Sequence, residues 1–91
     1  MGRSELNALE TAAKQPGTNT GEILFKLGMF YSVGGGIPAD KVAAHKWFNL
    51  AAARGNRDAA HYRRELAAEM SAHEISAAQR AAREWIVATA H

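Results

Sequence analysis

The 91-residue chain contains no cysteine. Disulfide bonds, thiolate metal ligands and a cysteine nucleophile are therefore excluded. Aromatic residues make up only 8% of the chain and prolines number two, so large rings and rigid turns are used sparingly. No apolar run approaches the roughly 20 residues that a membrane-spanning helix needs. The sequence predicts no membrane-embedded segment and no membrane partner.

Neither sign of charge predominates, because 11 basic and 9 acidic residues leave a net charge of only +2. This balance permits weak attraction to acidic partners without pointing to nucleic acid. Residues 1–14 contain no apolar segment of the kind found in secretory signals. We therefore expect a cytoplasmic protein, while a fragment of an exported protein stays open as an alternative.

Hydrophobic residues are plentiful at 47%, and charged residues stand at 22%, which is typical of one small globular domain. Many of the hydrophobic residues are alanines, which favour helix and allow close packing. Apolar side chains recur with helical spacing and never with strand alternation. The sequence predicts an all-α protein with helices at about 4–14, 21–33, 41–54, 57–70 and from 72 onward.

Helix boundaries carry recognisable end signals. Pro16 ends the first helix, and the residues 18–20 offer N-caps for the second. Asp40 is a predicted N-cap for the third helix. Ser71 and Glu74 have the spacing of a capping box, with each side chain bonding the other residue's backbone.

Residues 23–57 form a patterned unit of two helices joined by a glycine-rich turn. Gly28 lies inside the first of these helices, where glycine costs about 1 kcal/mol relative to alanine, so we expect a neighbouring backbone to approach it closely. The remaining patterned positions either fill the space between the two helices or make the turns. They are Leu27, Tyr31, Gly34, Gly36, Asp40, Ala44, Trp47, Phe48, Ala51 and Gly55.

This pattern resembles the Sel1-like repeat of bacterial proteins, a relative of the tetratricopeptide repeat. One complete repeat is covered, with a departure at Ala43, where the family often has lysine. The next copy begins in register at Ala59 but has Arg63 and Arg64 where the family has leucine and glycine. The resemblance implies a short α-solenoid of antiparallel helix hairpins that ends in a C-terminal capping helix.

The chain is accordingly divided within a single domain. Residues 1–17 form an N-terminal helix like half a repeat, residues 18–57 the full repeat, and residues 58–91 a degenerate half repeat plus the capping helix. About three repeats are normally needed for stability. A homodimer is therefore a further possibility.

The only histidines that could serve a metal or acid–base role are His45, His61, His73 and His91. They are far apart in the sequence, without a metal-binding motif or a carboxylate cluster between them. Solvated or helix-capping histidines are the simpler interpretation. We predict no catalytic residue, no metal site, no cofactor and no enzymatic activity.

The second predicted helix has more apolar residues than one buried face requires. Part of this set could face a partner or a second copy of the chain, or it could face the chain's own first helix. The resemblance implies an adaptor or scaffold that binds a protein or peptide through concave or apolar helix faces. The candidate partner-binding residues are Leu24, Phe25, Met29, Arg63 and Arg64.

An alternative function is nucleic-acid binding by a regulatory protein. The basic residues between Arg54 and Arg64 would supply the phosphate contacts. However, acidic residues interrupt this region, and it lacks the interleaved aromatics that favour single-stranded nucleic acid. We regard nucleic acid as the weaker alternative.

Overall fold

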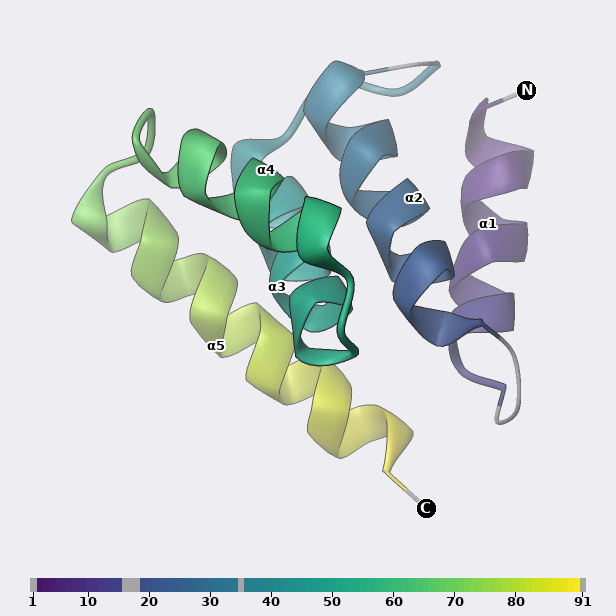
Figure 1. The fold of residues 1–91 in the computed structure, drawn as a ribbon. Coiled ribbons are helices and arrows are strands. Elements are labelled where there is room, and N and C mark those ends of the chain that lie inside the picture. The colour runs from purple at the N-terminus through teal and green to yellow at the C-terminus, as the bar shows by residue number, and fades with distance from the viewer. Residues whose placement is uncertain (1, 16–18, 35, 91) are drawn as a thin grey trace.

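A computed structural model describes residues 2–15, 19–34 and 36–90. Within this part of the chain the fold is all-helical, with five helices and no strand, as the sequence predicts (Figure 1). None of these helices is both long enough and apolar enough to cross a membrane. The helices are α1 (Gly2–Ala13), α2 (Thr20–Val33), α3 (Lys41–Ala53), α4 (Arg57–Ala67) and α5 (Ala72–Thr89).

Helix α3 is the centre of the packing, because α2, α4 and α5 all pack against it. Helix α1 packs against α2, at the edge of the molecule. Helix α5 packs chiefly on α3 and crosses beneath it, although α4 precedes α5 in the chain (Figure 1). The arrangement is therefore organised around one helix.

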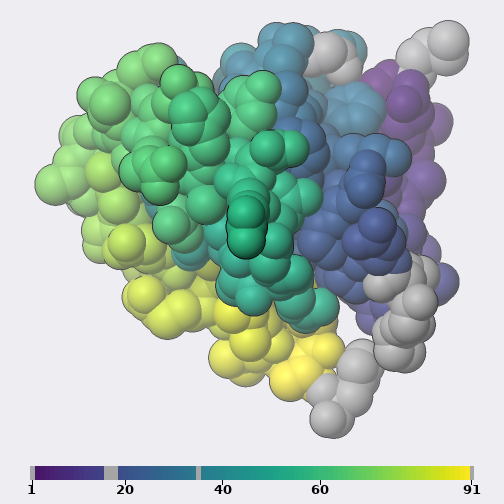
Figure 2. All heavy atoms as spheres, viewed as in Figure 1, coloured from purple at the N-terminus to yellow at the C-terminus, as the bar shows by residue number. Residues whose placement is uncertain are grey.

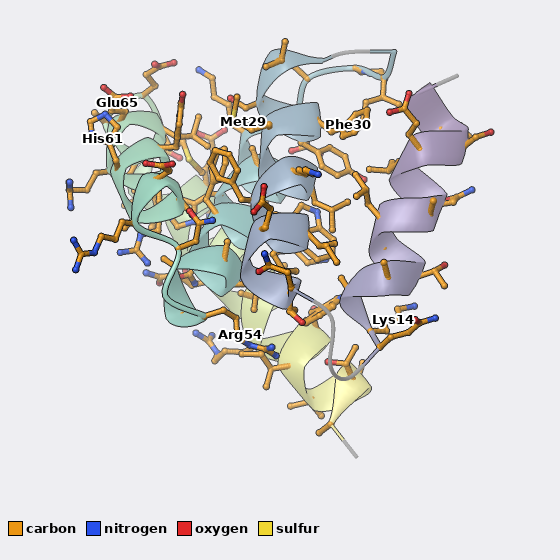
Figure 3. All side chains as sticks on the ribbon, turned by 45° about the vertical axis from the view of Figure 1, so that its right-hand side comes forward. Lys14, Met29, Phe30, Arg54, His61 and Glu65 are labelled. Atoms are coloured by element: carbon orange, nitrogen blue, oxygen red, sulfur yellow. The ribbon has the colours of Figure 1, made fainter. Side chains whose placement is uncertain are left out.

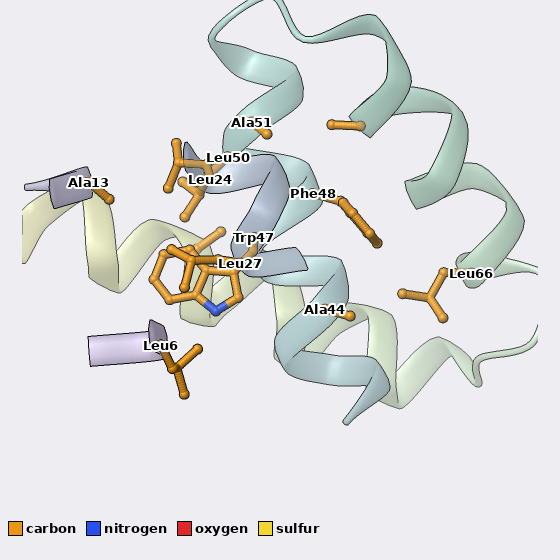
Figure 4. Close-up of a cluster of buried hydrophobic side chains, with 12 residues drawn as sticks. Leu6, Ala13, Leu24, Leu27, Ala44, Trp47, Phe48, Leu50, Ala51 and Leu66 are labelled. Atoms are coloured by element: carbon orange, nitrogen blue, oxygen red, sulfur yellow. The ribbon is translucent and has the colours of Figure 1, made fainter. Parts of the chain in front are cut away.

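Helix α3 contributes more buried residues to the core cluster than any other described helix, and these residues lie on more than one side of it (Figure 4). Phe48, Leu24 and Leu27 are the largest fully buried side chains. Small residues separate them, since Ala44 and Ala51 are also completely buried and bring the helix axes close. Leu6 from α1 and Leu66 from α4 close the cluster on either side.

Helix α2 is approached closely at Gly28, as predicted, but the approaching group is the aromatic side chain of Phe48 and not the backbone of a neighbouring helix. A Cβ atom at this position would lie 2.4 Å from Cδ1 and 2.5 Å from Cε1 of Phe48. The missing side chain therefore leaves room for the Phe48 ring directly on the surface of α2. The sequence predicted the close approach, but the approaching group differs from the expected one.

The ends of α3 and α5 follow the predicted capping signals. The backbone N–H of Ala43 donates to the Asp40 side chain over 3.0 Å. Both halves of the capping box are present, from Glu74 N to Ser71 Oγ and from Ser71 N to Glu74 Oε1. Glycines with positive φ make the turns, at Gly34, Gly36 and Gly55.

Two helix boundaries differ from the expected ones. Helix α1 begins at Gly2 instead of about residue 4, and α4 ends at Ala67 instead of about residue 70. Beyond Ala67, short turn bonds replace the helical ladder, with Met70 N donating to the carbonyl of Ala67 over 3.1 Å. The turn brings half-buried Met70 against the core.

Candidate partner-binding groove

An open groove of about 420 Å³ runs between α1 and α2. Leu9, Met29 and Phe30 give it an apolar lining, and Figure 3 shows Phe30 between the two helices. Glu5 on α1 and Lys26 on α2 also line it, and both side chains are exposed. The groove thus combines an apolar surface with one charge of each sign.

The sequence of α1 explains why this space is not filled. Glu5, Ala8 and Leu9 follow the i, i+3, i+4 spacing that places three residues on one side of a helix. Ala8 lies among them and has only a methyl group, so the helices meet through Leu9 and leave a hollow beside it. The neighbouring stripe of α1, with Leu6 and Ala13, is buried and anchors the helix.

Met29 is the predicted partner-binding residue that lies in this groove. Phe30 belongs to the apolar excess predicted on the second helix. The α1 residues of the lining, Glu5, Ala8 and Leu9, were not predicted, because α1 was interpreted as half of a repeat. The periodicity of α1 was the available signal. The helical spacing of α1 places Ala8 and Leu9 beside the buried stripe that contains Leu6 and Ala13.

Leu24 is not available to a partner, and its assignment as a binding residue is corrected. Its side chain has no exposed surface and lies in the core beside Leu27 (Figure 4). Leu24 and Leu27 are three residues apart, so they lie on the same side of α2. The excess of apolar residues on this helix is thus used partly within the chain.

Phe25 is half-buried between α2 and α4, where it takes part in a set of aromatic contacts. Its ring centroid lies 5.9 Å from that of Phe48 and 5.7 Å from that of Tyr62. Tyr62 in turn stacks on Phe48 at 5.6 Å, with 20° between the ring planes. Figure 2 shows α2 and α4 meeting on this face of the molecule. Phe25 therefore joins these helices, and 37% of Tyr62 remains exposed beside it.

None of the arginines between Arg54 and Arg64 lines the groove. Nη1 of Arg63 donates to Oδ1 of Asn49 on α3 over 2.8 Å, which directs Arg63 toward α3. Arg64 is exposed on α4, and Arg54 and Arg57 are exposed where α3 ends and α4 begins. The proposed partner set is thus divided among the core, the α2–α4 contact, the groove and the surface.

The histidines also lie apart from one another, and one of them differs from expectation. His61 is exposed and its Nε2 lies 3.4 Å from Oε2 of Glu65, on the outer side of α4 (Figure 3). His73 is exposed, and His91 lies outside the described residues. His45 was expected to be solvated or to cap a helix, but only 4% of it is exposed. In residues 2–15, 19–34 and 36–90, no group of three or more histidine, aspartate and glutamate side chains could hold a metal ion.

Comparison with known proteins adds no relative from which a role could be transferred. No protein-family model, no curated protein and no solved structure matches this chain.

Proposed function

We propose that the chain is a non-enzymatic protein-interaction module that binds an apolar segment of a protein or peptide in the α1–α2 groove. The observation that carries this proposal is the open groove with Leu9, Met29 and Phe30 in its lining. Apolar side chains left half-exposed in a concave surface are typical of recognition grooves. The proposal includes the Sel1-like, solenoid-type arrangement that the repeat pattern implies.

The packing supports that arrangement at two points. The two helices of the patterned unit, α2 and α3, form the most extensive helix pair of the molecule. Helix α4 then packs on both α3 and α2, as the first helix of a following repeat would. In this interpretation α5 is the capping helix, and its buried contact residues are the small Ala78 and Ala82.

The two charges of the groove give a bound segment a preferred direction. A cationic side chain of the partner would be favoured near Glu5, and a carboxylate near Lys26. Both charges are exposed, so they contribute orientation and association rate more than affinity. Most of the binding free energy would come from an apolar anchor placed against Met29 and Phe30.

Substitution of Ala8 tests this proposal without disturbing the core. Ala8 is exposed and lines the groove, so Ala8→Arg would place a long side chain in the hollow while preserving helix propensity. We expect this variant to lose at least tenfold in affinity for partners captured by the wild-type protein. Asn7→Arg is the matched control, because Asn7 is exposed on the same helix and does not line the groove.

The measurement is affinity capture with the intact chain, followed by titration of each captured protein against the three forms. Circular dichroism would check that both variants keep the wild-type helix content. If Ala8→Arg bound every captured protein as tightly as the wild type, the groove would not be the binding surface. DNA or RNA binding that falls steeply with salt and survives Ala8→Arg would instead support the nucleic-acid alternative.

A further inference from the structure

His45 is the buried ionisable side chain in the core of the described residues, with 4% of its surface exposed. It lies on α3, the helix against which α2, α4 and α5 pack. Its Nδ1 atom is inaccessible and has no hydrogen-bond partner. This environment favours the neutral imidazole. Protonation would bury a positive charge and would add an N–H donor that has no acceptor.

The charged side chain that acts on His45 is cationic: it is Arg63 of α4. Arg63 is held near it by the bond to Asn49, which lies one helical turn after His45 on α3. Lys41 lies one turn before His45, but carboxylates offset its charge: its Nζ is 3.3 Å from Oε1 of Glu69, beyond the end of α4, and Glu74 of α5 also interacts with it. The buried positions of α2 and α5, the other helices packed on α3, are uncharged: Leu24, Leu27, Gly28, Ala78 and Ala82.

We propose that His45 makes the contact between α3 and α4 acid-sensitive, so that its protonation loosens α4 from the rest of the molecule. The affected contact includes the Arg63–Asn49 hydrogen bond and the stacking of Tyr62 on Phe48. A second positive charge beside Arg63 would repel a guanidinium that the bond to Asn49 keeps in place. Moving α4 away would hydrate the imidazolium and remove this repulsion.

The direction of the pH dependence follows from the pKa of His45. Burial lowers this pKa below its ordinary value of 6.5, and Arg63 lowers it further. The opened state therefore binds more protons than the closed state at pH values between the lowered pKa and 6.5. The closed contact is fully stable above about pH 6.5 and loses stability as the pH falls below that value.

Amide hydrogen exchange measured by NMR tests the proposal in the full chain. Between pH 7 and pH 5, after correction for intrinsic exchange rates, the opening equilibrium of α4 should rise by up to about tenfold per pH unit. In His45→Gln, a neutral side chain that does not titrate, this extra pH dependence should disappear. His61→Gln is the matched control, because His61 is an exposed histidine on α4 itself and its replacement should leave the acid sensitivity in place.

Direct titration of the His45 ring by NMR gives an independent readout in the wild-type chain. A measured pKa of 6.5 or above would overturn the proposal, and so would equal acid sensitivity in the wild type and in His45→Gln. If His45→Gln failed to fold, the wild-type titration together with the α4 exchange data would still decide the question.

Discussion

At the scale of single residues, Gly28 is the described glycine at which an added Cβ would meet its neighbour most closely, and that neighbour is Phe48. The ring lies within 2.4 Å of the position where any other residue would have its Cβ. Phe48 also carries the stacked Tyr62 and lies beside Phe25. A disturbance at Gly28 would therefore be transmitted to the surface of α4.

We expect Gly28→Ala to destabilise the protein by up to about 2 kcal/mol. Alanine gains about 1 kcal/mol in helix propensity, but the methyl group must displace a buried ring at a cost of about 1–3 kcal/mol. Urea unfolding of the variant and the wild type would measure the difference. Gly21→Ala is the control on the same helix, because its Cβ would meet its nearest neighbours, Cβ and the carbonyl O of Arg54, at 3.4 Å. Equal stability changes at both glycines would show that the Phe48 contact has no special importance.

The role of a single residue could be predicted from the sequence where that role depends only on residues nearby in the chain. Asp40 and Ser71 have roles that depend on residues three positions away, so the sequence contains the whole interaction. Leu24 and His45 could not be placed in this way, because their burial depends on which helices pack around α2 and α3. The residues next to His45 in the sequence give no sign of whether another helix will cover it.

At the scale of the secondary-structure elements, the capping box fixes the start of α5. The Ser71 backbone N–H lowers the pKa of the Glu74 carboxyl, chiefly by the hydrogen bond that it donates. This half of the box is present above the ordinary pKa of glutamate and is lost as acid protonates the carboxylate. The other half depends on the Ser71 hydroxyl, which does not titrate in this range.

Ser71→Ala should cost about 1 kcal/mol, the usual effect of removing an N-cap hydroxyl. The free energy of unfolding at neutral pH, from chemical denaturation, would provide the measurement. Ser76→Ala serves as the comparison, because Ser76 is exposed within α5, where alanine is the better helix former. The assignment of the cap would be wrong if Ser76→Ala proved the more damaging substitution.

At the scale of the whole molecule, we expect resistance to local unfolding to be highest in α3 and lower in helices at the edge, such as α1. This helix packs against three others, whereas α1 packs mainly on α2 and has an open groove beside it. Helical periodicity predicted the number of helices and most of their ends. It could not predict that α5 would pack chiefly on α3, since this depends on contacts between residues distant in the chain.

Hydrogen exchange near neutral pH should therefore show weaker protection in α1 than in α3. Helix α1 can open alone by losing its contacts with α2, while exposure of α3 requires most of the core to separate. Mass spectrometry of exchanged peptides would be sufficient to compare the two helices. Identical opening free energies in α1 and α3 would mean that the molecule unfolds only as a single unit.

The pairing of Trp47 with Trp85 has a practical consequence for such experiments. The two indole rings meet edge to face at 5.6 Å, one from α3 and one from α5, and they are the only tryptophans in the sequence. Tryptophan fluorescence and the near-ultraviolet signal of these rings will therefore report mainly the docking of α5. The signal would also respond to detachment of α1, because Trp85 lines a pocket with Glu10 of that helix and with Lys14 just beyond its end, but it would be less sensitive to loosening of α4. Agreement between that optical signal and helix content would be a strict test of whether the five helices separate together.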